Sequence, residues 1–194
     1  MKILIYILPL FFVVLSSCSD KLRSLDDTAI EVSSVNGEEI SYSKNITSGD
    51  KQFAIATGGI GSIRYLDIRA SQNGVLLGKI DDELEGMVYE TITGDLNQNS
   101  KPEILLLMLK NAYEGKIDVV GFEFDGKIFK RFDLPALDDE LAYGYEGKDH
   151  FYISKSKLVR EFPIHSVKAD ARRRIFYLLD KELALTMDKF EVLN

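Results

Sequence analysis

Short stretches in which apolar residues alternate with polar ones, or follow one another without a break, recur along the chain between clusters of turn residues. Runs of this kind are typical of β-strands. We expect strands over residues 39–42, 52–57, 62–70, 75–80, 87–93, 104–109, 116–124, 127–132, 151–154, 157–163, 174–180 and 183–192. Asn73-Gly74 and Asp125-Gly126 are pairs that accept a tight turn, and they predict hairpins. The pattern predicts an all-β fold, an antiparallel sandwich or barrel-like domain.

Helical periodicity is almost absent from the chain. Residues 135–141 are the exception, because they start at Pro135 and carry acidic residues in what would be the first turns of a helix. We therefore expect at most one or two short helices.

The stretch 93–113 combines the most specific polar pattern with the most apolar run. Residues 104–109 are all apolar, and they are preceded by Pro102 and followed by the polar pair Lys110 and Asn111. A short apolar run with polar ends favours a buried central strand over a helix. We expect its end, residues 110–113, to form an exposed tip that the core holds in place, as binding loops often are.

The first 20 residues have the pattern of an export signal, with Lys2, an apolar stretch over 3–15 and then small residues. Leu15-Ser16-Ser17-Cys18 resembles the lipobox of bacterial lipoproteins, which implies that Cys18 becomes lipidated. An ordinary signal peptide with an incidental Cys is the alternative. We expect a signal peptide over 1–17, a lipid-bearing tether over 18–50 and one domain over 51–194. The expected location is the periplasm or cell surface, and Ser19 after Cys18 favours an outer-membrane anchor.

The charge balance restricts the choice of partners. Acidic residues outnumber basic ones 31 to 24, and the formal net charge is −7. Because a nucleic-acid backbone repels such a chain, we expect no nucleic-acid partner. Contact with the membrane is expected through the lipid only.

The turn before the apolar run has oxygen-bearing side chains at alternate positions. Asp95, Asn97, Asn99 and the later Glu103 have the spacing of a weakened calcium loop, in which oxygen ligands gather on one side of a turn. Ser100 stands where such loops have Gly. The alternative is an Asx-rich turn whose side chains bond their own backbone.

Catalytic patterns find little support. His150 and His165 lie in strand-like contexts without a second metal ligand at a suitable spacing, and the chain has no G-x-S-x-G motif. We expect no enzymatic activity.

Several motifs, in order, are similar to those of the periplasmic inhibitors of I-type (invertebrate-type) lysozyme. They are Ile60-Gly61-Ser62, Gly94-Asp95-Leu96-Asn97 with Pro102-Glu103, Leu134-Pro135-Ala136-Leu137-Asp138-Asp139, Gly144-Tyr145-Glu146-Gly147-Lys148-Asp149-His150-Phe151 and Leu158-Val159-Arg160-Glu161-Phe162-Pro163-Ile164. The resemblance implies a β-sandwich-like domain that inserts a loop into the substrate cleft of a lysozyme.

The resemblance also implies which residues meet the partner. Tyr113 matches the Tyr of the family's inhibitory Ser-Gly-x-Tyr loop, whereas Lys110 and Asn111 replace its Ser and Gly. The expected partner-binding residues are Lys110, Asn111 and Tyr113, and inhibition follows if this loop fills the cleft. The alternative is a non-enzymatic binding module for a cell-wall glycan or another envelope protein on the same scaffold. Homodimer formation is left open.

Overall fold

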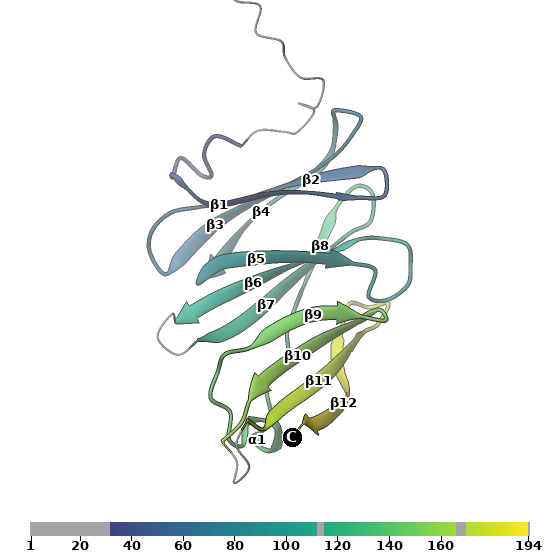
Figure 1. Ribbon diagram of the computed structural model, residues 1–194. Coiled ribbons are helices and arrows are strands. Elements are labelled where there is room, and N and C mark those ends of the chain that lie inside the picture. Colours follow the sequence, from purple (N-terminus) through teal and green to yellow (C-terminus); the bar gives the residue numbers. More distant parts are fainter. Residues whose placement is uncertain (1–31, 112–114, 166–169, 194) are drawn as a thin grey trace, which may run out of the picture.

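Three antiparallel sheets, stacked one on another, make up the protein (Figure 1). The structure is a computed structural model, and it describes residues 32–111, 115–165 and 170–193. The site residues Cys18 and Tyr113 expected from the sequence lie outside these residues.

The first sheet consists of β1 (Ile40–Ser48), β2 (Lys51–Gly58), β3 (Ile63–Gln72) and β4 (Val75–Glu85). The second consists of β5 (Met87–Gly94), β6 (Glu103–Asn111), β7 (Lys116–Phe124) and β8 (Phe129–Asp133). The third consists of β9 (His150–Ser154), β10 (Lys157–Pro163), β11 (Arg172–Leu179) and β12 (Leu185–Leu193).

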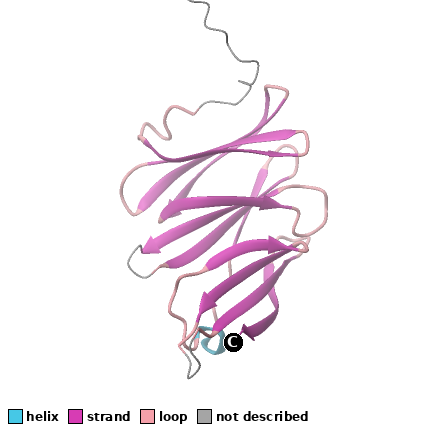
Figure 2. Ribbon diagram, viewed as in Figure 1, coloured by secondary structure: helices cyan, strands magenta, loops and turns pink. Residues whose placement is uncertain are grey.

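Each sheet is a meander in which the strands lie side by side in the order of the sequence. All neighbouring strands are antiparallel, so short turns suffice to join them. Strands dominate the described chain, and α1 (Asp139–Ala142) is the one helix among its elements (Figure 2). The prediction of an all-β antiparallel fold is confirmed.

The second sheet has both of its faces covered. In β6, Ile104, Leu106 and Met108 belong to the core shared with the first sheet, whereas Leu105 and Leu107 belong to the core shared with the third. Successive side chains of a strand point to opposite faces, so a strand between two cores has no polar face. This explains the unbroken apolar run at 104–109. Each fully buried Leu contributes roughly 1.5–3 kcal/mol of transfer free energy.

The hairpin at Asp125-Gly126 is present, and an Asx turn closes it. The Asp125 side chain accepts hydrogen bonds from the backbone N–H groups of Lys127 and Ile128, at 3.1 and 2.9 Å. Gly126 has a φ of +99°, a value that side chains disfavour.

The connection between the second and third sheets contains the helix, which is shorter than expected. The sequence predicts a helix over 135–141, whereas α1 begins at Asp139. The Asp138 side chain accepts the N–H of Leu141 at 2.8 Å and so caps the N-terminus of α1.

The first sheet starts earlier than the boundary near residue 51 that the sequence suggested. β1 lies within the expected tether and pairs with β2 from Ile40 to Ser48. Tyr42 and Ile46 of β1 pack against the first core, so this segment belongs to the folded domain. No helix in the part of the chain that the structure describes is long and apolar enough to cross a membrane.

Candidate functional site

The end of the β6–β7 hairpin is where the sequence places the partner-binding residues. Lys110 is the next-to-last residue of β6, and its ammonium lies 2.8 Å from Asp118 Oδ2 and 3.7 Å from Glu85 Oε2. The hydrogen bond to Asp118 raises the pKa of Lys110, so the side chain is charged at neutral pH. The backbone of Asn111 pairs with Lys116. Lys110 is therefore one member of an ion-paired group at this end of the hairpin.

A cavity of about 580 Å³ adjoins this hairpin end. Its apolar wall comes from the segment before α1, and its polar wall comes from three cations, one acid and one tyrosine. The residues lining it are Lys110, Lys116, Ile117, Asp118, Leu134, Pro135, Ala136, Leu137, Ala142, Tyr145 and Arg160. A concave apolar surface with a few polar groups is the usual form of a binding site.

A buried polar network supports the inner wall of this cavity. Arg160 Nε donates to Asp149 Oδ1 at 2.7 Å, and Arg160 Nη2 donates to the Tyr145 hydroxyl at 3.0 Å. The Tyr145 hydroxyl in turn donates to Asp149 Oδ2, which also accepts the N–H of Ile117 at 3.0 Å. The side chains of Arg160 and Asp149 are 7% and 0% exposed, so the pair is shielded from water. Burial first, and then the hydrogen bond to Asp149, raises the pKa of Tyr145, which keeps the hydroxyl protonated.

This network joins the last two motifs of the sequence resemblance. Tyr145 and Asp149 come from the first motif, and Arg160 comes from the second. The sequence analysis did not assign a role to these residues. A signal was present, since Arg160 stands between Leu158 and Phe162 at a position that alternation directs into the core. A cation at such a position requires a buried acid as its partner.

The turn before β6 uses its oxygen atoms on its own backbone. Asp95 accepts the N–H groups of Asn99 and Ser100 at 3.0 and 2.9 Å, and Asn99 Oδ1 accepts the N–H of Lys101 at 2.8 Å. Such bonds are those of an Asx-rich turn. Within the described ranges, no three His, Cys, Asp or Glu side chains are grouped as metal ligands. Calcium binding by Asp95, Asn97, Asn99 and Glu103 stays a prediction, and it would require these oxygens to exchange N–H donors for the ion.

Two carboxyl groups lie beneath this turn in different states. Burial is the main cause that raises the pKa of Glu103, to about 7. Its Oε2 accepts the N–H of Leu96 at 2.6 Å, whereas its buried Oε1 has no hydrogen-bond partner in the structure. Burial would also raise the pKa of Glu123, but hydrogen bonds from Asn97, Asn99 and Lys101 outweigh it and lower that pKa. The Asn97 and Asn99 side-chain amides thus donate to Glu123 (2.9 and 2.6 Å) and stabilise the turn.

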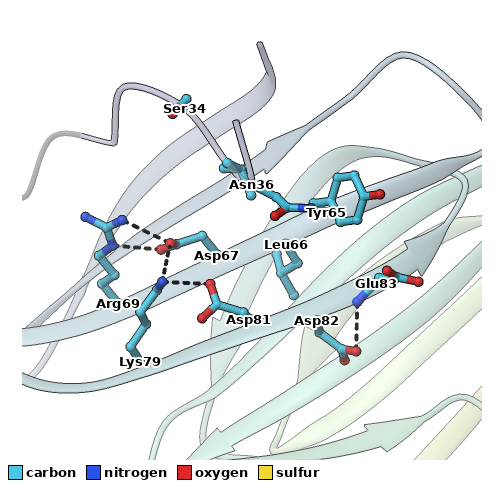
Figure 3. Close-up of a pocket in the computed structure, with 11 residues that line it drawn as sticks. Ser34, Asn36, Tyr65, Leu66, Asp67, Arg69, Lys79, Asp81, Asp82 and Glu83 are labelled. Carbon is cyan, nitrogen blue, oxygen red and sulfur yellow. Dashed lines mark hydrogen bonds and ion pairs between the residues drawn. The ribbon is translucent and has the colours of Figure 1, made fainter. Parts of the chain in front are cut away.

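A second hollow of about 800 Å³ lies on the outer face of the first sheet (Figure 3). Asp67 is its buried centre, 2.8 Å from Arg69 Nε and 3.2 Å from Lys79 Nζ. Lys79 also meets Asp81 at 2.7 Å, so the cations in the hollow are already paired with acids of the same sheet. The sequence analysis did not identify this hollow, because its residues come from two strands and the turn at 34–36.

The two histidines lie apart from these features. The ring centroids of His150 and Tyr152 are 5.3 Å apart, and His165 is 87% exposed and lies 3.5 Å from Glu146.

Comparisons of the chain with protein-family models, with curated proteins and with solved structures find no match.

Proposed function

We propose that the protein is a non-catalytic binding protein that holds a lysozyme-like glycan hydrolase with the end of its β6–β7 hairpin. One observation supports this proposal. The hairpin belongs to the second sheet, which is covered on both faces, and its end lies beside a cavity with an apolar wall and a cationic rim. The strands on either side of the hairpin end are held by packing on both faces of that sheet. The sequence resemblance supplies the class of partner.

In this proposal Tyr113 is the main contact and enters the substrate cleft. An aromatic ring contributes a large buried area, and its hydroxyl can meet a catalytic carboxylate. Lys110 contributes less, because a carboxylate of the partner has to compete with Asp118 and Glu85. Cys18 carries the lipid, so the protein acts at the envelope surface of the cell.

The second candidate function is a binding module for a cell-wall glycan or another envelope protein. It is favoured by the ion pairs of Lys110 and by the hollow on the first sheet, which offers a separate surface. In this case the hairpin end does not contact the partner.

Binding of a panel of I-type, c-type and g-type lysozymes separates the two functions. If the hairpin end binds lysozyme, Tyr113→Ala weakens lysozyme binding by roughly 2 kcal/mol or more, about thirtyfold, as for a buried interface tyrosine. Tyr65→Ala is the matched control, because Tyr65 lines the hollow on the first sheet. Titration calorimetry and a cell-wall lysis assay provide the measurements. Absence of any lysozyme binding by the unaltered protein would refute the proposal, and loss of another partner's binding in Tyr65→Ala alone would favour the second candidate.

A further inference from the structure

The last strand of the third sheet carries apolar side chains that its own chain leaves partly exposed. In the pairing of β12 with β11, Met187 lies opposite Tyr177, Phe190 opposite Ile175 and Val192 opposite Arg173. Tyr177 and Ile175 point into the second core, so the paired residues of β12 point to the same side. Yet Met187, Phe190 and Val192 are 43%, 37% and 47% exposed, and Leu185 is the one buried residue of the strand.

This strand is also an edge. In the order of the third sheet, β12 is terminal and pairs on one side only, with β11. Its outer edge presents backbone N–H and C=O groups that another strand can pair with. The strand contains no Pro, which would block such pairing, and its one bulge against β11 lies at Asp188, before Phe190.

The charges of β12 select the partner. Lys189 and Glu191 flank Phe190, and their side chains share the outer face, where Lys189 Nζ lies 2.7 Å from Glu191 Oε1. In an antiparallel pair of two identical strands centred on Phe190, Lys189 of each copy lies opposite Glu191 of the other. Symmetric pairs centred on Asp188, Lys189 or Glu191 place a charge opposite itself, which is unfavourable. Among the symmetric registers of this strand, the one centred on Phe190 sets opposite charges against each other.

We propose that β12 pairs with β12 of a second copy of this chain, antiparallel and centred on Phe190. The two four-stranded sheets then become one sheet of eight strands. The Phe190 rings of the two copies lie side by side on the face that is uncovered in the single chain, with Val192 next to them. The pairing satisfies the backbone groups of the open edge, and the contact between the two Phe190 rings reduces their exposure. This inference is independent of the proposed lysozyme binding.

Charge exchange provides the test. K189E alone puts carboxylates opposite carboxylates in both symmetric positions, and E191K alone puts ammonium groups opposite ammonium groups. We expect each variant to raise the dissociation constant of the dimer by about tenfold or more. An equimolar mixture of the two variants restores opposite charges at both positions, and so does the double variant K189E/E191K. Both should recover the dimer.

Sedimentation velocity of the full chain in one detergent measures these states. All variants carry the same N-terminal segment, so a shared micelle cannot account for differences between them. Lys181→Glu is the matched control, since it makes the same charge change in the exposed turn before β12 and should leave the dimer intact. A monomeric unaltered protein would overturn the inference. So would single variants that dimerise as well as the unaltered protein, or a mixture that dimerises no better than its components.

Discussion

Glu103 shows how one residue acquires a different role from the one its spacing suggests. It follows the oxygen-bearing side chains of Asp95, Asn97 and Asn99 as a later carboxylate that could complete a cation site. The fold instead buries it completely, with one oxygen on the N–H of Leu96 and the other without a partner. A carboxyl group in this position favours its neutral form.

The pH dependence of stability follows from this burial. The pKa of Glu103 is about 7 in the folded protein, above its ordinary value of 4.5, so the folded state keeps a proton that the unfolded state releases between these values. Its contribution to stability is complete below pH 4.5 and is lost as the pH rises through 7. This contribution of Glu103 to the free energy of unfolding is roughly 3 kcal/mol at most.

Urea denaturation over this pH range measures the effect. We expect the free energy of unfolding to fall toward higher pH in the unaltered protein and to change less in Glu103→Gln. Glu123 adds to the raised pKa of Glu103, whereas its own lowered pKa places its own titration at more acidic pH. An equal slope in both proteins would show that Glu103 is already ionised.

Arg160 is the residue whose loss should be most costly near the cavity. Arg160→Ala leaves the carboxylate of Asp149 buried without its cation, and we expect a loss of roughly 3–5 kcal/mol in the free energy of unfolding. Arg172→Ala is the comparison, since that side chain also forms an ion pair at 2.8 Å, with Glu161, but is 38% exposed. For Arg172→Ala we expect the free energy of unfolding to fall by less than about 1 kcal/mol. Similar losses in the two variants, measured by chemical denaturation, would contradict a special role for the buried pair.

At the scale of elements, β6 and β1 show what a local pattern can and cannot tell. The apolar run of β6 predicts a buried strand wherever the strand lies, because both of its faces are apolar. β1 alternates between half-buried and exposed residues and is rich in Ser, Thr and Asn, as a tether also is. Only the pairing of β1 with β2 and its contacts with β5 distinguish this segment from a tether. Tyr42 and Lys44 hydrogen-bond to Thr91 of β5, at 2.8 and 2.7 Å.

A chain that begins at Lys51 should therefore be less stable than one that begins at Val32. Loss of β1 uncovers the part of the first core on which Tyr42 and Ile46 pack, and it leaves β2 as an edge. We expect a loss of roughly 3 kcal/mol or more, from two apolar side chains and the strand pairing. Thermal melting of the two chains compares them. An unchanged melting temperature would mean that β1 is dispensable.

At the scale of the whole molecule, the second sheet determines where the candidate site lies. It shares one core with the first sheet and another with the third, so its β6–β7 hairpin has packed layers on both sides (Figure 1). The cavity beside the hairpin is lined by the second sheet, the segment around α1 and β10, which are distant in sequence. In the third sheet, β12 is a terminal strand, and among the described strands it pairs with β11 alone.

Local patterns of residues were enough to predict the all-β class, the positions of most strands, the turn at Asp125-Gly126 and the central place of β6. These depend on side-chain periodicity and turn chemistry, which act between residues close in the chain. The tertiary structure alone decided the division into three stacked sheets, the inclusion of β1, the pairing of Arg160 with Asp149 and the burial of Glu103. Each of these depends on contacts between segments far apart in the sequence, where burial sets the cost of a charge and no local pattern records the partner.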